Sequence, residues 1–236
     1  MSQPTFATLH VTRDRGVVKV VIDNPPVNVL SLAMMADLMT LLTTLREDET
    51  AKVVVFESAD PEFFIAHVDM TLVDDEDAAA DPTAGAPAGL NVFQALGEAL
   101  RTQPQVTIVK LTGMARGGGA EFVAAADMSF AAIGRAGLGQ MEVLGGIVPG
   151  GGGTQYLLNR AGRNRALEIV LGAELFDAQT AERYGWINRA RVCGAAVGER
   201  SVSGQGRLQE HLGRLGSNGR DETVLVRHLA CRLSPA

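Results

Sequence analysis

The spacing of apolar residues in the first sixty positions predicts two strands, a helix and a third strand. Residues 6–12 and 17–22 are short apolar runs separated by a polar turn, which is typical of paired strands. Residues 32–46 carry apolar side chains at helical spacing, and Ser31 stands where an N-cap is expected. Residues 52–56 form a short apolar run of the kind found in buried strands. This order of elements predicts an α/β fold.

Apolar residues continue to recur at strand or helix spacing up to about position 190. Strands are predicted at 106–111 and 127–133, because both are short apolar runs bounded by turn residues. Gly172 is expected as the left-handed residue after a helix, and Gly185 in the same role after a helix that Asp177 caps. The remaining predicted helices cover 90–101, 122–126, 154–159, 163–171 and 178–184.

Two segments differ in composition from the rest. Residues 74–87 are acidic and rich in Ala, Pro and Gly, which predicts a mobile loop. Residues 191–236 contain no Phe, Ile, Met, Trp, Tyr or Lys, so they are poorly suited to packing. We therefore expect a core domain at 1–190 and an atypical C-terminal region at 191–236, disordered in part.

Composition excludes several classes of function. A chain of 236 residues with 46% hydrophobic residues suits one folded domain, and its net charge of −6 argues against nucleic acid or an anionic membrane as partner. No apolar run approaches the ~20 residues that span a bilayer. Residues 1–16 are polar, so no signal peptide is expected, and Cys193 and Cys231 have no metal-ligand spacing. A cytoplasmic protein is the simplest interpretation.

The candidate chemistry begins at three glycines, Gly117–Gly119, which follow a predicted strand and precede a predicted helix. A glycine amide at a helix N-terminus is unpaired and favours negative charge. Glu121 adds a carboxylate on the first helical turn. An anion-stabilising amide beside an acid/base group suits enolate chemistry. Taken alone, such a glycine run is more often a simple turn, and such a glutamate is more often a solvated charge.

Six ordered stretches favour the functional interpretation. They are residues 24–31, 63–70, 117–121, 139–143, 147–155 and 181–188. Through these stretches, residues 6–190 resemble the enoyl-CoA hydratase/isomerase (crotonase) superfamily. The resemblance implies a crotonase (ClpP-like) spiral of ββα units with a smaller C-terminal helical region. It also implies a homotrimer or a dimer of trimers, with residues 191–236 as the oligomerisation and lid region.

By this resemblance, the amides of Val68 and Gly118 hold the thioester oxygen of an acyl-CoA. Glu142 exchanges the proton at C2, and Glu121 orients and activates water. The chain departs from the family pattern at His67 and Val68, but a backbone amide survives any substitution except proline. The resemblance implies no metal and no redox cofactor, because coenzyme A arrives with the substrate. The remaining expected substrate contacts are Asn28, Val29, Ala66, His67, Asp69, Arg116 and Gly117.

Several of these residues have a structural alternative. His67 has no positioned partner in the sequence, and such histidines are more often structural or exposed. Arg116 could meet a CoA phosphate or a polar substrate group, or form a surface salt bridge. Asp69 and Asp127 could instead tie loops to the ends of helices or strands. Trp186 is expected in the core or at an interface.

The expected activity is that of an enoyl-CoA hydratase in fatty acid β-oxidation, which adds water syn to a trans-2-enoyl-CoA and forms 3-hydroxyacyl-CoA. Two glutamates favour hydration, since isomerases of this family commonly keep only the later one. The alternatives are an isomerase, another enolate reaction on acyl-CoA, or a non-catalytic acyl-CoA-binding protein. The last is suggested by residues 191–236, because tails in this family are usually longer, more helical and often offer a lysine near CoA. Acyl-chain length is not encoded in these motifs.

Overall fold

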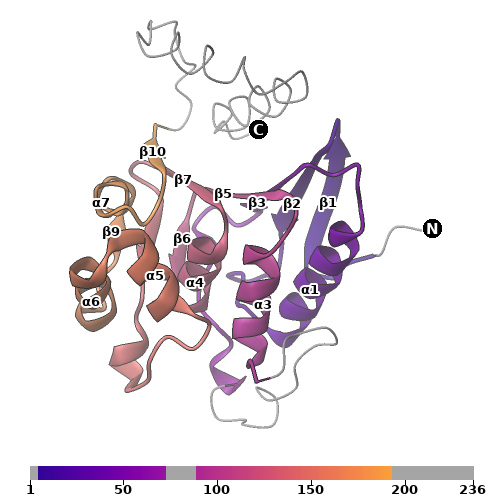
Figure 1. Ribbon diagram of the computed structural model, residues 1–236. Helices are drawn as coiled ribbons and strands as arrows, with labels where there is room; N and C mark the ends of the chain where they lie inside the picture. The colour runs from indigo at the N-terminus through magenta and orange to yellow at the C-terminus, as the bar shows by residue number, and fades with distance from the viewer. Residues whose placement is uncertain (1–4, 73–88, 193–236) are drawn as a thin grey trace, which may run out of the picture. The chain divides into compact units, whose positions relative to one another are not determined.

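The computed structural model describes residues 5–72 and 89–192. It has a mixed α/β fold built on two sheets with helices packed against them (Figure 1), which confirms the predicted fold class. The predictions for residues 74–87, and those for nearly all of 191–236, lie outside the described residues.

The larger sheet has six strands in the order β1-β2-β3-β5-β7-β10. β1 and β2 form an antiparallel hairpin, whereas β2, β3, β5 and β7 pair parallel to one another. Val53, Val54, Val55 and Phe56 of β3 are all buried, as expected for a central parallel strand. The strands are β1 (Leu9–Asp14), β2 (Val17–Ile22), β3 (Val53–Ser58), β5 (Val106–Leu111), β7 (Met128–Ala132) and β10 (Arg189–Arg191).

The smaller sheet has four strands in the order β4-β6-β8-β9. Its first three strands are parallel, and β9 pairs antiparallel with β8. None of these strands exceeds three residues, and the sequence pattern predicted none of them. The strands are β4 (Phe63–Ile65), β6 (Met114–Arg116), β8 (Gly137–Gly139) and β9 (Phe176–Asp177).

A ββα unit is repeated along the chain. Strands β3, β5 and β7 lie side by side in the larger sheet, and each is followed by a short strand, β4, β6 or β8, of the smaller sheet. A helix then closes each unit: α3 (Val92–Arg101), α4 (Gly118–Ala125) and α5 (Gly153–Ala161). Each repeat therefore moves the chain one strand further in both sheets, so that α4 begins where β6 ends.

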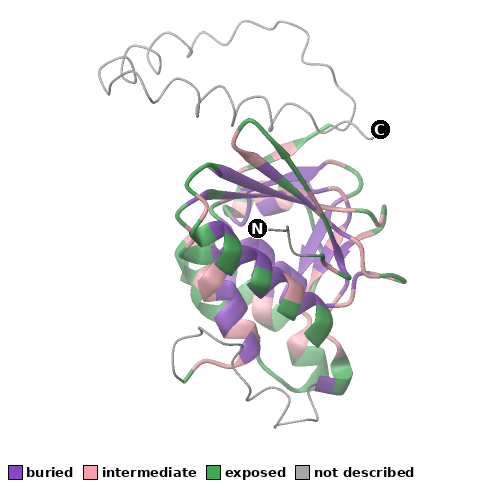
Figure 2. Ribbon diagram, turned by 90° about the vertical axis from the view of Figure 1, so that its right-hand side faces the viewer, coloured by how far each residue is buried: buried purple, intermediate pink, exposed green. Residues whose placement is uncertain are grey.

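The helices form a layer against the sheets. α1 (Leu32–Arg46), α3, α4 and α5 follow one another in that order (Figure 1), and neighbouring helices pack together. α1 and α5 each have an exposed outer side (Figure 2). In α3 only Arg101 is exposed, and every residue of α4 is buried. In the core, the ring of Phe56 in β3 meets that of Phe122 in α4 edge-on, with 5.2 Å between the centroids. The other helical segments are α6 (Arg163–Gly172), α7 (Ala178–Tyr184), η1 (Met70–Leu72) and η2 (Glu142–Gly145).

Most predicted elements are present, with two instructive differences. α1 has the predicted bounds, and the Ser31 hydroxyl accepts a hydrogen bond from the Met34 amide. The prediction for Gly172 is wrong: that residue is still helical, and Ala173 adopts the left-handed conformation with a φ of 51°. The helix predicted at 122–126 begins four residues earlier, at Gly118. The first turn was not predicted because it begins with glycines, which have a poor helix propensity.

No helix within residues 5–72 and 89–192 is both long and apolar enough to cross a membrane. In the same residues, no group of three or more His, Cys, Asp or Glu side chains is arranged to hold a metal ion.

Candidate active site

The glycine run forms the turn from β6 into α4, and each glycine is needed for a different reason. Gly117 has a φ of 53°, a conformation that residues with side chains rarely adopt. A Cβ added to Gly118 would lie 2.4 Å from Cγ2 of Val68. A Cβ on Gly119 would lie 2.4 Å from the carbonyl oxygen of Ile65. The run therefore lets the start of α4 pack directly on β4 and the segment that follows it.

That segment carries Val68 and is held by Leu30. The Leu30 amide donates to the His67 carbonyl at 2.8 Å, and the Leu30 carbonyl accepts from the Asp69 amide at 3.1 Å. Within the described residues, the amides of Val68 and Gly118 donate to no protein acceptor. Two neighbouring free amides, one of them at a helix N-terminus, can stabilise an oxyanion. The structure brings together the two residues whose amides were predicted to do so.

Glu121 points from the first turn of α4 to the N-terminus of α5. Its side chain is only 5% exposed, and its Oε1 accepts hydrogen bonds from the Gly151 amide at 2.8 Å and the Gly153 amide at 2.7 Å. Gly152, between them, has a φ of 102° and is the N-cap of α5. These bonds and the α5 dipole favour the carboxylate form. Both use one carboxylate oxygen, which leaves Oε2 without a hydrogen bond in the described part of the chain.

Burial, with a smaller contribution from the nearby charge of Glu142, nevertheless raises the pKa of Glu121 to about 7. The amides of Gly151 and Gly153 act in the opposite direction, since they stabilise the charged form. A carboxyl group with a pKa near 7 exchanges its proton readily at neutral pH. Glu121 is therefore suited to act as an acid or a base, and the interpretation as a solvated charge is excluded by its burial.

Glu142 approaches the same turn from the other side, at the start of η2. Its Oε1 lies 3.2 Å from the position that a Cβ on Gly117 would occupy. Gln140 is fully buried, and with its amide nitrogen turned toward Glu142, that nitrogen lies 2.9 Å from both carboxylate oxygens. Burial raises the pKa of Glu142, so this side chain too is inclined to keep a proton. The second predicted carboxylate thus lies beside the glycine turn.

The arrangement resembles an acid/base pair beside an anion site. Two carboxyl groups with raised pKa values, Glu121 and Glu142, can hold one proton between them. The Val68 and Gly118 amides offer stabilisation for negative charge on an oxygen. Such a set can protonate a carbon next to a thioester carbonyl and activate a water molecule.

Asn28 and Val29 mainly stabilise the chain around the site. Asn28 is buried, and its side-chain nitrogen donates to Ser58 Oγ at 2.8 Å and to two carbonyls of β4. The Val29 carbonyl accepts from the Asn24 side chain at 2.8 Å. These bonds hold the 24–31 stretch against β4. They leave the predicted substrate contacts of Asn28 and Val29 untested.

Two residues near Val68 that are predicted to contact the substrate, Arg116 and His67, bind neighbouring backbone carbonyl groups. Arg116 Nε donates to the Ala66 carbonyl at 3.1 Å, and its guanidinium lies 5.0 Å from the centroid of the Phe63 ring. His67 Nδ1 lies 2.6 Å from the Val68 carbonyl, which fixes its ring against its own backbone. Arg116 makes no salt bridge in the described residues. Its role as a substrate contact, and that of His67, stay predictions.

Asp69 and Asp127 have the structural contacts that were the alternative for them. Asp69 Oδ1 accepts from the Thr71 amide at 3.0 Å and from its hydroxyl at 2.8 Å, which closes the start of η1. Asp127 Oδ2 accepts from the Thr107 amide and hydroxyl, both at 2.8 Å. Trp186 is fully buried, as expected for a core residue.

Sequence reasoning missed Gln140, Gly151 and Gly153 as members of the site. Gln140 stands two positions before Glu142, so an alternating pattern could have placed both on one side of the chain. The glycines at 150–153 lie in the 147–155 stretch that carries the family resemblance, but no role was predicted for their amides. Their amides were the useful signal, because an N-terminus without a side-chain cap needs an anion from elsewhere in the chain.

Comparisons with known proteins agree with this arrangement. The sequence model of the enoyl-CoA hydratase/isomerase family matches residues 12–210. A crystal structure of a Streptomyces avermitilis protein assigned as an enoyl-CoA hydratase is 54% identical, with a TM-score of 0.78; the match covers 96% of this chain and 80% of that one. The fold is therefore the one shared by crotonase-type proteins, as predicted.

Curated relatives are more distant. The fatty acid oxidation complex subunit alpha of Idiomarina loihiensis is 31% identical over 79% of this chain, and the match spans 26% of that protein. Mouse enoyl-CoA hydratase domain-containing protein 2, which is mitochondrial, is 29% identical over 75% of this chain. Here the match spans 58% of the relative. The chain therefore matches less than two thirds of the length of each of these two proteins.

Proposed function

Because the chain belongs to the enoyl-CoA hydratase/isomerase family, we propose that it hydrates a trans-2-enoyl-CoA to 3-hydroxyacyl-CoA. The observation that carries the proposal is the pair of carboxyl groups, buried Glu121 and half-buried Glu142, on either side of the glycine turn that presents the Gly118 amide. A hydratase needs two such groups, one for water and one for carbon. A place in fatty acid oxidation is part of the same proposal, as is a cytoplasmic location.

In the proposed reaction the thioester oxygen accepts hydrogen bonds from the Val68 and Gly118 amides. Ionised Glu121 takes a proton from water as the resulting hydroxide bonds to C3. The electron pair of the C2–C3 double bond moves toward the carbonyl and forms an enolate. Protonated Glu142 then delivers its proton to C2, so that one water has been added across the double bond. The proton on Glu121 returns to Glu142 through solvent or directly.

The contacts of the two carboxyl groups support this division of roles, whereas their pKa values do not separate them, because burial raises both and brings that of Glu121 to about 7. Glu121 has two amide donors that favour its charged form, which suits a base toward water. Glu142 lies next to Gly117, beside the proposed oxyanion site, and this position suits an acid toward C2. Donors at an oxyanion of this kind typically contribute a factor of about 10²–10³ in rate.

The test is hydration of crotonyl-CoA and longer enoyl-CoA esters, followed by the loss of absorbance of the conjugated thioester. Glu142→Gln should lower kcat by about 10²–10⁴, since a positioned acid/base group contributes on that scale. Glu168→Gln, which changes an exposed glutamate in α6, serves as the matched control and should leave kcat unchanged. Full turnover by Glu142→Gln would exclude that residue as the proton donor.

The same assay separates the alternatives. An isomerase, or another enzyme that forms the enolate, would exchange deuterium at C2 in D₂O without net hydration. This outcome would require only Glu142 and the two amides. A non-catalytic protein would bind a saturated acyl-CoA in a calorimetric titration but would neither hydrate an enoyl-CoA nor exchange deuterium.

We also propose assembly into a homotrimer or a dimer of trimers. The support is a set of exposed apolar side chains on η2, the loop that follows it, α5 and α6, with Leu144 76% exposed and Leu171 64% exposed. Light scattering should give three or six times the mass of the chain, and Leu144→Asp should lower it. A monomer at micromolar concentration would contradict the proposal. The other exposed apolar residues of the set are Val143, Ile147, Val148, Leu158 and Leu167.

A further inference from the structure

The ring of Tyr156 lies between the glycine turn at the start of α5 and helix α3. A Cβ added to Gly152 would lie 2.7 Å from Cε2 of Tyr156 and 2.9 Å from its Cζ. On the opposite side, a Cβ added to Gly97 of α3 would lie 2.7 Å from the tyrosine hydroxyl. The ring therefore touches backbone on both sides, and only glycine at these positions leaves room for it.

The hydroxyl group fixes the position of the ring. It donates a hydrogen bond to Glu98 Oε1 at 3.2 Å, and Glu98 is itself bound by Arg101 through Nε at 2.8 Å and Nη2 at 2.6 Å. Burial, together with the charge of Glu98, raises the pKa of Tyr156 to about 12. The hydroxyl therefore keeps its proton and remains a donor throughout the neutral pH range.

A second bond ties the same turn to α3. Asn91, the N-cap of α3, donates from Nδ2 to the Gly150 carbonyl at 3.1 Å. The turn is thus attached at Gly150 by Asn91 and at Gly152 by the ring of Tyr156. On either side of Gly152 stand Gly151 and Gly153, whose amides both bind Glu121 Oε1.

We propose that Tyr156 is a positioning residue for the reaction, because it holds the Gly151 and Gly153 amides on Glu121. The inference rests on the proposed function, in which Glu121 activates water. Tyr156 acts through the glycines. Its ring sets the depth of the turn and its hydroxyl sets the position of the ring. If the ring is removed, the turn can relax toward α3, and the two amide bonds to Glu121 lengthen.

The test compares Tyr156→Leu, which removes the ring, with Tyr156→Phe, which removes only the hydroxyl. Tyr184→Phe is the matched control, because the Tyr184 hydroxyl also donates to a glutamate, Glu168 at 2.8 Å, but on the exposed side of α7. All three are compared with the unmodified chain by circular dichroism to establish that they fold.

The first readout does not depend on turnover. Glutamate carboxyl carbons are labelled with ¹³C, and the Glu121 signal is identified by its absence from Glu121→Gln. We expect its titration midpoint to rise by about one pH unit in Tyr156→Leu and by less in Tyr156→Phe, because weaker amide bonds favour the neutral form. The titratable groups that face Glu121 are Glu142 and the tyrosine itself. The titrations are therefore repeated with Glu142→Gln to remove coupling between the carboxyl groups.

The second readout is the pH dependence of kcat/KM for crotonyl-CoA. In Tyr156→Leu the acidic limb should move up with the midpoint of Glu121, and kcat should fall about tenfold while KM changes less than threefold. Tyr184→Phe should match the unmodified chain in both readouts. A merely structural role would lower the amount of folded protein without moving the midpoint.

An unchanged Glu121 midpoint in folded Tyr156→Leu would overturn the inference. If that variant does not fold, Tyr156→Phe decides in the same way, by a raised or an unchanged midpoint. A protein without hydratase activity whose Glu121 midpoint still moves would refute the proposed function and leave the role of Tyr156 intact.

Discussion

The side chain of Val68 lies directly against the Cα atom of Gly118, so that a methyl group on this glycine would be 2.4 Å from Cγ2 of the valine. Leu30 closes the other side, with its Cδ2 at 3.3 Å from the same position. The two residues whose amides are proposed to bind the thioester oxygen therefore also determine how closely their chain segments approach. The branched side chain of Val68 makes this contact tight.

This contact predicts a compensating pair of variants. Gly118→Ala should destabilise the protein by about 1–3 kcal/mol, because an added methyl group in a packed site forces neighbouring atoms to move. It should also lower kcat for crotonyl-CoA by about tenfold or more, as the two amides move apart. Adding Val68→Ala should restore part of both losses, and a double-mutant cycle by urea unfolding and kinetics measures the coupling.

A glycine with open surroundings provides the control for that cycle. Gly172, the last residue of α6, has no atom within 4 Å of an added Cβ, and its φ is not positive. Gly172→Ala should therefore be neutral or slightly stabilising. Additive effects of Gly118→Ala and Val68→Ala would show that the contact does not limit the distance between the amides.

Five strands of the larger sheet could be predicted from the sequence, whereas its three-residue strand β10 and the smaller sheet could not. Strands such as Val17–Ile22 and Val106–Leu111 have six residues, long enough for an apolar pattern to show. Strands of three residues, such as Phe63–Ile65 and Gly137–Gly139, are too short for any period. Only the three-dimensional arrangement shows that each ββα repeat contributes one of them.

The two carboxylates of the site could be proposed from motifs, but their surroundings could not. Nothing near Glu121 in the sequence indicates that its Oε1 binds amides 30 and 32 residues further along the chain. A solvated glutamate and a buried one look the same in an amino-acid string, because burial is decided by the packing of α4 against α5. The raised pKa of Glu121 is a consequence of that packing.

Burial of Glu121 is predicted to lower the stability of the folded protein at neutral pH, although it gives the carboxyl group a pKa suited to acid/base chemistry. Its pKa is about 7 in the folded protein and roughly 4.3 in an unfolded chain, so between these values the folded state binds a proton that the unfolded state releases. Stability should therefore fall as pH rises from about 4 to 7. Glu121→Gln, whose side-chain oxygen can still accept from Gly151 and Gly153, should be more stable at pH 8 by roughly 3 kcal/mol.

The measurement is urea unfolding of both proteins at several pH values. The advantage of Glu121→Gln should shrink toward zero near pH 4, where both states of the unmodified protein are largely protonated at this site. Hydratase activity should be lost in the same variant. A stability difference that does not depend on pH would contradict an ionisable origin.

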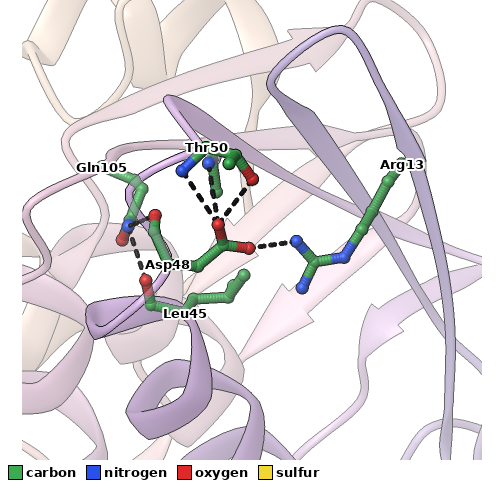
Figure 3. Close-up of polar contacts among 6 residues, drawn as sticks. Arg13, Leu45, Asp48, Thr50 and Gln105 are labelled. Carbon is green, nitrogen blue, oxygen red and sulfur yellow. Dashed lines mark hydrogen bonds and ion pairs between the residues drawn. The ribbon is translucent and has the colours of Figure 1, made fainter. Parts of the chain in front are cut away.

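For Asp48 we predict that folding stability depends on pH in the opposite direction. It follows α1 and accepts hydrogen bonds from the amide and hydroxyl of Thr50, at 2.9 and 2.6 Å, and it pairs with Arg13 of β1 (Figure 3). The Thr50 bonds and the Arg13 bond hold the pKa of Asp48 well below its usual range. The folded state therefore favours the ionised form, and this stabilisation is present above about pH 4 and is lost as pH falls further.

Asp48→Ala should destabilise the protein by about 1 kcal/mol at pH 7, a modest value because the side chain is partly exposed. The loss should be smaller at pH 3, where the unmodified protein has begun to lose the same stabilisation. Asp14→Ala is the matched control, since Asp14 pairs with Arg15 and its side chain is 74% exposed. Urea unfolding at both pH values checks each expectation, and equal losses from the two variants would exclude a special role for Asp48.

The contacts of Arg160 predict that the proposed oxyanion site, at the N-terminus of α4, depends on the C-terminus of the same helix. Its Nε donates to the Ala124 carbonyl at 2.8 Å and its Nη2 to the Ala126 carbonyl, so this half-buried guanidinium satisfies the C-terminus of α4, the helix that begins at Gly118. Arg160→Met keeps most of the apolar stem but leaves both carbonyls without a donor, which should cost about 2–3 kcal/mol of folding stability.

Because α4 in Arg160→Met then frays from its C-terminus, hydrogen exchange should quicken there first, and kcat should fall less than for Gly118→Ala. Arg163→Met, at the exposed first position of α6, should change neither quantity. Equal stability of Arg160→Met and Arg163→Met would refute the role of Arg160.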